Sequence, residues 1–251
     1  MMDHANPVAD NAIIAYLRAN PADIVCLQEV ELRRNSHYLT LESLKQSMHD
    51  LYPYTYIDFK VYNKYRQYGN VVLSRYPLIN KQTVRYDSRA NISSRCDIVV
   101  DGDTIRLITN HLESNRLTAS DWMDTLNTNE VKHAAERISI KMQQAGRVRL
   151  RQARVLRREI KQSPYPIIVA GDCNTIPLSR VYLVLRGRLR DTFLEGSFGR
   201  IGSTFTYHHL GIRIDYIFCS RSMDVLDSRV DYDAEQSDHY PLRTRLSYTR
   251  F

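Results

Sequence analysis

A short apolar run that ends abruptly in polar residues constrains the fold of this chain more than any other feature. The run covers residues 167–170 (IIVA), and Gly171, Asp172 and Asn174 follow it directly. A buried strand that ends this way delivers its polar residues to a sheet edge, where α/β enzymes place their chemistry. In extended chain Asp172 and Asn174 point to the same side, so they can share one pocket. An ordinary turn before Pro177 is the alternative interpretation.

Helical and strand-like patterns alternate early in the chain. Apolar residues at helical spacing predict helices over residues 8–17 and 38–51, each followed by a proline that ends it. Residues 23–27 between them predict a buried strand. A longer helix is expected over residues 131–160, with a break near Gly146. This order favours a layered α/β architecture.

The long helix separates two groups of strand-like runs. Asp101 and Gly102, between two of these runs, are typical of a hairpin turn, so at least part of the sheet is expected to be antiparallel. We therefore predict a single domain over residues 1–251 with a four-layer α/β/β/α sandwich, in which two mainly antiparallel sheets pack face to face with helices outside. The runs cover residues 54–59, 69–74, 82–86, 96–100, 105–111, 166–172, 203–207, 213–219, 225–230 and 242–246.

Composition and charge limit the classes of function. The net charge of +7 suits an anionic partner such as nucleic acid, a phosphorylated ligand or an anionic membrane, although many globular proteins are mildly basic. The arginines in the second half of the long helix favour a solvated face, with a phosphate-contacting surface as the alternative. No apolar run is long enough to cross a bilayer, and no signal peptide is visible. The four scattered cysteines favour buried, reduced thiols over a zinc site or disulfides.

Polar residues at the ends of the predicted strands suit a hard divalent cation. Carboxylate and amide oxygens are ligands that Mg²⁺ or Mn²⁺ takes, whereas zinc prefers closely spaced His or Cys. Asp215 lies within an apolar run, where a carboxylate needs a partner, and His239 is a natural one. Individually, each residue could also be an ordinary strand-end side chain. The set comprises Glu29, Asn110, His111, Asp172, Asn174, Asp215, Asp238 and His239.

Six segments in a fixed order carry a family resemblance. They are residues 23–30 (DIVCLQEV), 69–77 (GNVVLSRYP), 109–112 (TNHL), 171–177 (GDCNTIP), 213–217 (RIDYI) and 237–242 (SDHYPL). Together they resemble the endonuclease/exonuclease/phosphatase family, a metal-dependent group that includes pancreatic-type deoxyribonucleases, abasic-site endonucleases, inositol polyphosphate 5-phosphatases and bacterial sphingomyelinases. The resemblance spans residues 23–246. It implies metal-dependent phosphoester hydrolysis and says almost nothing about the substrate.

The resemblance also implies roles for the metal-binding and water-activating residues. Glu29 looks like the family's metal-binding glutamate, and Asp238 would contact the metal or its waters. Asp172 looks like the residue that activates the attacking water. Asn174 would help to hold that water and the phosphate.

The remaining site residues would act on the phosphate. His239 looks like the histidine that stabilises charge on the phosphoryl oxygens, oriented by Asp215. His111 stands where the family places a His or Tyr near the scissile phosphate. Asn70 and Asn110 are expected to line the substrate site. The resulting reaction is in-line displacement at phosphorus, in which cationic groups offset the developing negative charge.

The sequence departs from the family pattern in two places. Cys173 stands where a bulky apolar residue is commoner, which we expect to change only packing. The family normally begins with a strand that carries a metal-site Asn in a Tyr-Asn-Val-like segment, and no such strand precedes the helix expected from residue 8. We expect an N-terminal truncation, with a lost strand as the alternative, and therefore weakened metal binding and activity.

Two classes of function follow. The first is a Mg²⁺- or Mn²⁺-dependent phosphoesterase, nuclease-like and monomeric, that acts on a phosphate ester such as nucleic acid. Phospholipid and inositol-phosphate substrates stay open, because the tyrosine-rich residues 52–68 could form a lipid-facing surface, although tyrosines are also common in strands. The second class is a non-catalytic relative that binds a phosphorylated ligand or a partner.

Overall fold

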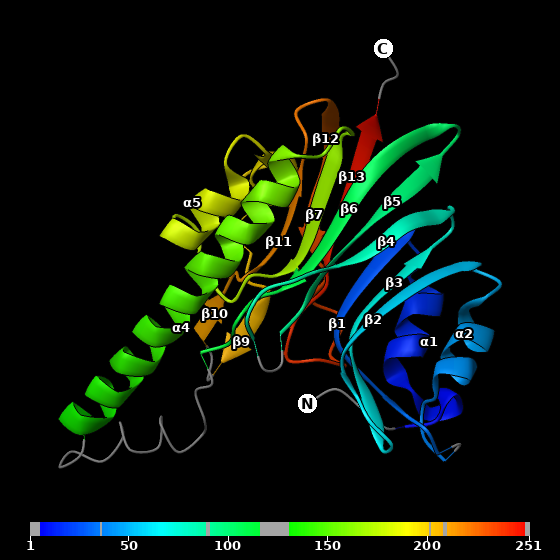
Figure 1. Ribbon diagram of the computed structural model, residues 1–251, viewed down its shortest axis with the longest axis horizontal. Coiled ribbons are helices and arrows are strands. Elements are labelled where there is room, and N and C mark those ends of the chain that lie inside the picture. Colours follow the sequence, from blue (N-terminus) through cyan, green and yellow to red (C-terminus); the bar gives the residue numbers. More distant parts are fainter. Residues whose placement is uncertain are drawn as a thin grey trace.

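Four layers of secondary structure make up the part of the chain that the structure describes. The structure is a computed structural model, and it describes residues 6–35, 37–88, 91–115, 131–200, 202–207 and 210–248. Figure 1 shows two helices on the outer side of one sheet and a long helix on the outer side of the other. The predicted α/β/β/α sandwich is confirmed.

The first sheet contains three antiparallel strands in the order β1-β3-β2. Its outer face is covered by α1 and α2, whose side chains Ile14, Leu17, Leu44 and Met48 pack against Leu73 of the central strand. The bounds are η1 (Val8–Asp10), α1 (Ala12–Ala19), β1 (Ile24–Arg33), α2 (Leu41–Met48), β2 (Tyr54–Tyr62) and β3 (Arg66–Ser74).

The start of α1 explains why this helix is shorter than its apolar pattern suggests. The Asn11 side chain accepts a hydrogen bond from the Ile14 amide at 3.1 Å, which caps the helix there. The α-helix therefore begins at Ala12, and a short 3₁₀ turn precedes it.

The second sheet carries the strand-end motifs. Its six strands lie in the order β4-β5-β6-β7-β11-β8, and β6 and β7 are parallel while the other pairs are antiparallel. The predicted hairpin turn at Asp101 and Gly102 connects β5 to β6, as expected. The bounds are β4 (Leu78–Val84), β5 (Ser93–Val100), β6 (Asp103–His111), β7 (Ile167–Asp172), β8 (Arg190–Asp191) and β11 (Asp215–Cys219).

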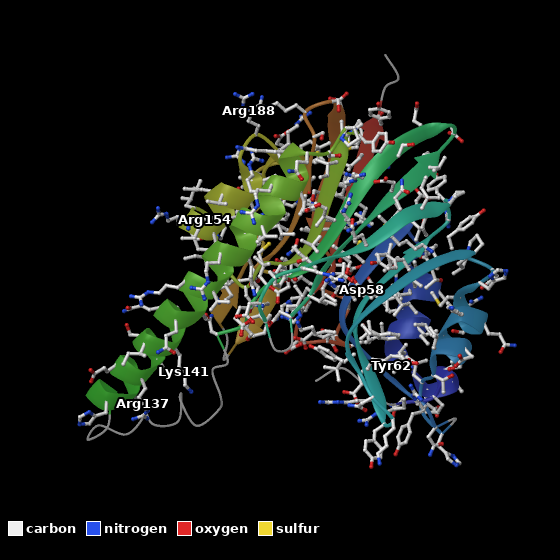
Figure 2. The ribbon with its side chains drawn as sticks, in the orientation of Figure 1. Asp58, Tyr62, Arg137, Lys141, Arg154 and Arg188 are labelled. Atoms are coloured by element: carbon white, nitrogen blue, oxygen red, sulfur yellow. The ribbon has the colours of Figure 1, made fainter. Side chains whose placement is uncertain are left out.

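The long helix α4 (Val131–Lys161) is uninterrupted, and its C-terminal part packs on the outer face of the second sheet. The predicted break at Gly146 is wrong. A glycine inside a helix costs only about 1 kcal/mol relative to alanine, and buried side chains of α4 such as Leu156 and Ile160 pack against the sheet. Figure 2 shows Arg154 extending away from the sheet, as expected for a solvated face.

Two short helices and two pairs of strands complete the described chain. The helices α5 (Arg180–Arg186) and α6 (Thr192–Gly196) were not predicted. β9 (Phe205–Tyr207) pairs with β10 (Leu210–Ile212), and β12 (Met223–Val230) pairs with β13 (Leu242–Tyr248). Among the described helices, none is long and apolar enough to span a membrane.

The strand predicted at residues 23–27 is present as the start of β1, but the expectation that it is buried is wrong. Ile24, Val25, Cys26 and Leu27 are only partly buried, although they form one of the most apolar runs of the chain. The reason is their position, because β1 is an edge strand of its sheet.

Candidate active site

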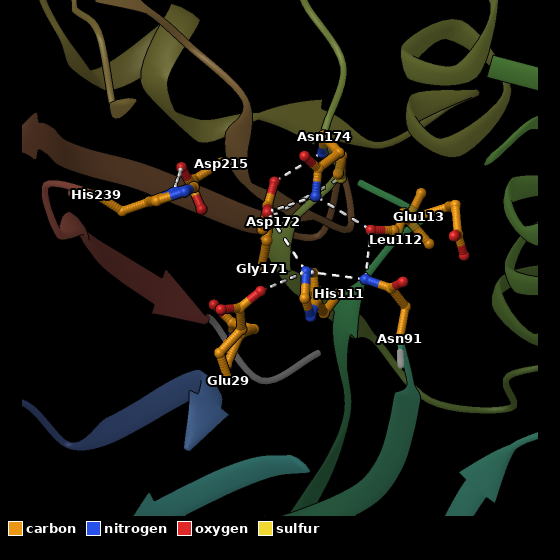
Figure 3. Close-up of polar contacts among 12 residues, drawn as sticks. Glu29, Asn91, His111, Leu112, Glu113, Gly171, Asp172, Asn174, Asp215 and His239 are labelled. Atoms are coloured by element: carbon orange, nitrogen blue, oxygen red, sulfur yellow. Dashed lines mark hydrogen bonds and ion pairs between the residues drawn. The ribbon is translucent and has the colours of Figure 1, made fainter. Parts of the chain in front are cut away.

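Three neighbouring strands of the second sheet place candidate residues side by side. His111 of β6 lies opposite Asp172 of β7 in the parallel register, and Asp215 of β11 lies opposite Asp172 in the antiparallel register. Because residues paired across strands lie side by side, the register alone places three ionisable groups at one edge of the sheet. Figure 3 shows this cluster.

Gly171 permits the close approach of β7 to β6 at this edge. Its φ is +137°, and a Cβ atom at this position would lie 2.0 Å from the carbonyl oxygen of Asn110. No residue with a side chain can tolerate both conditions. The glycine before Asp172 is therefore required by the backbone.

Asp172 and Asn174 contact each other directly. Asp172 Oδ1 accepts a hydrogen bond from the Asn174 amide, and Asp172 Oδ2 accepts one from Asn174 Nδ2, both at 2.7 Å. Asn174 Nδ2 also donates to the carbonyl of Leu112 at 3.1 Å. Asn174 adopts a left-handed backbone with φ +48°, which asparagine tolerates better than most residues. These bonds fix the orientation of the Asp172 carboxylate.

The surroundings of Asp172 disfavour its negative charge. Burial raises the pKa of Asp172 to about 8, and the nearby charge of Asp215 acts in the same direction. The charge of His239 opposes this rise. A carboxyl group whose pKa is raised toward the neutral range is typical of acid–base groups.

Asp215 and His239 form the ion pair that the sequence suggests. His239 Nδ1 lies 2.8 Å from Asp215 Oδ2. Burial alone would lower the pKa of His239, but the carboxylate of Asp215 outweighs this effect and raises it to about 10. His239 is therefore a cationic imidazolium at neutral pH, and its Nδ1–H donates to Asp215.

Glu29 approaches the cluster from the other sheet. The register of β1 shifts between Leu27 and Val30, and Glu29 within this bulge has a left-handed φ of +58°. Its side chain is 52 % exposed, and its Oε1 lies 3.2 Å from His111 Nε2. Glu29 thus combines a strained backbone with an accessible carboxylate, a combination that is common at functional sites.

His111 is held by a residue that the sequence analysis did not single out. Asn91 Nδ2 lies 2.9 Å from His111 Nε2 and donates to the Leu112 carbonyl at 2.9 Å. Burial lowers the pKa of His111, which favours the neutral imidazole. The Leu112 contact orients the amide of Asn91 so that its NH₂ group faces His111.

A buried arginine also lies behind the site. Arg149 is 6 % exposed, and its Nη1 donates to the Glu113 carbonyl at 2.8 Å. Burial lowers the pKa of Arg149, and the charge of Asp172 opposes that fall. In the sequence Arg149 is one of several arginines of the long helix, and only the helical periodicity of the buried positions distinguishes it.

Two predicted substrate-binding residues lie behind the cluster. Asn110 is buried, and its Nδ2 donates to the Asp172 carbonyl at 3.0 Å. Asn70 is buried too, and its Nδ2 donates to the Ile92 carbonyl at 3.1 Å. The structure therefore places both amides within the packing that supports the site, whereas a substrate role for them stays a prediction.

A long cleft connects the other predicted residues. Its volume is about 1490 Å³. Asp238 lies at its rim, exposed and next to His239. The predicted site residues in its lining are Glu29, His111, Asp172, Asn174, Asp215, Asp238 and His239.

The donor chemistry fits a hard cation bound partly by water. Among the described residues no group of three or more His, Cys, Asp or Glu side chains is arranged to hold a metal ion. Mg²⁺ is usually bound by only one or two carboxylates, with waters and substrate phosphate completing its shell. Glu29 and Asp238 both have exposed side chains that line this cleft, and their carboxylates are the ligand type that such a cation takes.

Comparison with solved structures supports the fold. An endonuclease/exonuclease/phosphatase from Beutenbergia cavernae DSM 12333 is 22% identical with a TM-score of 0.64, and the match covers 94% of this chain and 65% of that protein. The human Nocturnin catalytic domain is 17% identical (TM-score 0.61; 95% of this chain, 85% of that one). A humanized D. rerio TDP2 is also 17% identical (TM-score 0.62; 94% and 89%).

Comparison with protein families supports the same assignment. No curated protein matches the chain. Residues 3–239, nearly the whole chain, match the profile of the Endonuclease/Exonuclease/phosphatase family. The chain therefore belongs to the endonuclease/exonuclease/phosphatase family.

Proposed function

We propose that this protein hydrolyses phosphate esters with the help of a divalent cation, Mg²⁺ or Mn²⁺. The observation that carries the proposal is the alignment of His111, Asp172 and Asp215 across three strands, together with the Asp215–His239 ion pair. This arrangement places an acid–base carboxylate, Asp172, and a protonated histidine, His239, in one cleft.

Asp172 is the proposed general base. Its carboxylate accepts the proton of the attacking water, while the bonds from Asn174 hold it in place. Because burial raises its pKa to about 8, positive charge brought into the cleft favours the ionised form that the reaction needs. A bound cation held by Glu29 and Asp238 would supply such charge and act as a Lewis acid.

His239 is the proposed stabiliser of the phosphoryl oxygens. The ion pair with Asp215 keeps it protonated, so it can donate a hydrogen bond from its second ring nitrogen to a developing negative charge. Asp215 does not contact the substrate in this scheme. It orients the imidazolium and maintains its charge, as the carboxylate of a catalytic triad does.

The proposed substrate class is a phosphodiester or phosphomonoester, with nucleic acid first. The net charge of +7 favours a polyanion. Human Nocturnin was solved with a bound sulfate, an anion with the tetrahedral shape of phosphate. Phospholipid and inositol-phosphate esters offer the same reacting group and are therefore the alternatives.

A hydrolysis panel tests this proposal. Duplex DNA, abasic DNA, RNA, sphingomyelin and inositol phosphates are each incubated with the protein in Mg²⁺, in Mn²⁺ and in chelator. We expect hydrolysis of at least one substrate class that requires the metal and is lost in the Asp172→Asn variant. Hydrolysis at the wild-type rate in this variant would rule out Asp172 as the base, and no hydrolysis of any substrate would contradict the proposal.

A non-catalytic relative that binds a phosphorylated ligand is the second candidate. It is favoured by the lack, among the described residues, of three clustered metal ligands. Calorimetric titration with Mg²⁺ distinguishes the two. Binding that is lost in the Glu29→Gln variant supports the enzyme, whereas no binding at millimolar Mg²⁺ supports the second candidate.

A further inference from the structure

The exposed face of α4 carries a row of positive charge along the second half of the helix. From residue 147 to residue 161 every exposed side chain is cationic, and these side chains recur at intervals of three or four residues. This spacing places them on one face of the helix. We call this row the basic stripe; it consists of Arg147, Arg151, Arg154, Arg158 and Lys161.

The opposite face of the same helix is fixed on the protein. Arg149 and Gln152 are buried, and the buried Ala153, Leu156 and Ile160 belong to the core that lies against the second sheet. Because these contacts hold the helix, it cannot rotate about its axis to hide the charged face. The basic stripe is therefore a permanent surface of the folded protein, and Figure 2 shows Arg154 projecting from it.

Neighbouring acidic residues do not neutralise the basic stripe. Glu159, the one acidic residue between positions 147 and 161, pairs with Arg95 at 3.3 Å. No ion pair of the described residues includes a member of the stripe. Like charges three or four residues apart on a helix repel each other, and the helix dipole favours cations only in its last turn. A polyanion bound along the stripe would relieve this repulsion.

The basic stripe is separate from the candidate active site. Among the described residues of α4, Met142 lines the cleft and no member of the stripe does. The helix packs on the outer face of the second sheet, whereas the candidate site residues lie in the cleft. A substrate that fills only the cleft therefore leaves the charge of the stripe without a ligand.

The composition and length of the basic stripe suit a phosphodiester backbone. Four of its five members are arginines, whose planar fork can bond two phosphate oxygens at once. At about 1.5 Å of rise per residue the stripe spans about 21 Å. A DNA duplex carries about one negative charge per 1.7 Å of its axis, so several phosphates fall within that length.

We propose that the basic stripe is a second binding surface, which holds the phosphodiester backbone of a nucleic-acid duplex away from the cleft. The ligand class is a duplex polyanion, and the contacts are charge-assisted hydrogen bonds from arginine to phosphate oxygens. This inference does not rest on the proposed hydrolytic function, because the stripe binds whether or not the cleft hydrolyses.

A lipid surface fits the basic stripe less well than a duplex does. Helices that bind at a bilayer interface bury an apolar face in it. The apolar face of α4 already packs in the protein core, and the exposed positions from 147 to 161 include no apolar side chain. Attraction to an anionic membrane would therefore be electrostatic alone, without the apolar insertion that strengthens such binding.

Salt-dependent binding, measured by fluorescence anisotropy, tests the proposal. The probe is a labelled DNA duplex of about 20 base pairs, which exceeds the stripe in length at about 3.4 Å per pair. Chelator excludes metal-dependent hydrolysis during the measurement. The stripe variant combines Arg151→Gln, Arg154→Gln and Arg158→Gln, and glutamine preserves helix propensity.

The expected result follows from counterion release. Each phosphate contact contributes about 0.9 to the slope of log affinity against log salt concentration. The slope of the stripe variant should therefore be smaller than that of the wild type by about 2.7, and its affinity at low salt should fall by about tenfold or more.

A matched control removes the same number of charges elsewhere. It combines Arg18→Gln, Lys45→Gln and Arg75→Gln, all at exposed positions outside α4. Arg18 and Arg75 already pair with Asp50 and Asp23, and exposed pairs of this kind contribute little to stability. A reduced slope in the stripe variant, with a slope close to that of the wild type in the control, supports the proposal.

Three outcomes would overturn it. Equal slopes for the stripe variant and the wild type would show that the stripe does not contact the duplex. Equal losses in the stripe variant and the control would assign binding to the overall charge. If the stripe variant lost binding to phosphatidylserine vesicles and kept its binding to DNA, the stripe would be a membrane surface.

A small substrate separates this test from that of the proposed function. Bis(p-nitrophenyl) phosphate is a diester that can occupy only the cleft, so its metal-dependent hydrolysis should be equal in the wild type and the stripe variant. Loss of this hydrolysis in the stripe variant alone would overturn the separation of the stripe from the cleft. Its absence in both proteins would count against the proposed function and leave the binding result unchanged.

Discussion

Asp215 lies directly opposite Asp172 in the β7–β11 ladder, and it holds His239 at 2.8 Å. The Asp215 carboxylate changes the pKa of both neighbours in the same direction. The charge of Asp215 raises the pKa of Asp172, and it also raises that of His239. Removing the Asp215 charge should therefore lower the pKa of both groups, and that of Asp172 less completely, because burial is the larger cause of its rise.

The first prediction concerns the charge of His239. Replacing Asp215 by asparagine removes the partner that outweighs burial, so the pKa of His239 should fall from about 10 by roughly 1–3 units. The histidine Cε1–H resonance, followed by NMR against pH in the metal-free protein, measures the change. A His239 that still titrates near pH 10 in this variant would show that other groups hold its proton.

The second prediction separates catalysis from stability at Asp172. Asp172→Asn should reduce turnover by about 10²–10⁴-fold, the usual contribution of a general base. Because the folded-state pKa of Asp172 is raised, its ionised form opposes folding above the unfolded pKa of about 4. The substitution should therefore preserve or increase the free energy of unfolding at pH 8, measured with urea. Near-normal turnover would remove Asp172 from the role of base.

The third prediction concerns the backbone at Gly171. Gly171→Ala places a Cβ 2.0 Å from the Asn110 carbonyl oxygen at a φ of +137°, so it should destabilise the fold by about 3 kcal/mol. Gly146→Ala is the matched control, because its Cβ would meet only the Arg149 guanidinium at 4.0 Å. This control should stabilise the protein by about 0.5–1 kcal/mol. Equal effects of the two variants in urea denaturation would contradict the account of Gly171.

The fourth prediction concerns a buried ion pair of the second sheet. Arg106 Nε and Nη2 bond the Asp97 carboxylate at 2.7 and 3.0 Å. Burial alone would raise the pKa of Asp97, but the bonds from Arg106 and Asn80 lower it. Asp97→Ala should cost about 3–5 kcal/mol, since it leaves the Arg106 charge buried without its partner.

The lowered pKa also sets the pH dependence of this pair. Its stabilisation is fully present above the unfolded pKa of about 4 and is lost as the pH falls through the folded value. The difference in unfolding free energy between the wild type and Asp97→Ala should therefore shrink below pH 4. A difference that is the same at pH 7 and pH 3 would show that Asp97 does not act through its charge.

Much of the site could be predicted because its residues occupy strand ends. Asp172 and His111 stand at the ends of short apolar runs that the sequence identifies as strands. The parallel pairing of β6 with β7 then brings the two residues together. The partner of Asp215 was also predictable, because a carboxylate in an apolar run needs one. The local sequence pattern was sufficient for residues that stand at the end of a recognisable apolar strand.

The remaining features depend on packing that local pattern does not encode. Asn91 contacts His111 from a segment without helical or strand periodicity. Arg149 differs from the exposed arginines of α4 only in facing the sheet. The partial burial of β1 depends on its edge position, which is set by the topology of the whole domain. No inspection of residues 24–27 alone could reveal it.

The burial of Cys173 has a consequence for chemical modification of the protein. This thiol lies between Asp172 and Asn174, yet it is almost fully enclosed, and burial raises its pKa well above the ordinary value. Alkylating reagents and peroxide attack the accessible thiolate, a form that Cys173 does not offer. A sulfur atom thus lies beside the proposed catalytic base without making it sensitive to oxidants, and activity should survive exposure to iodoacetamide.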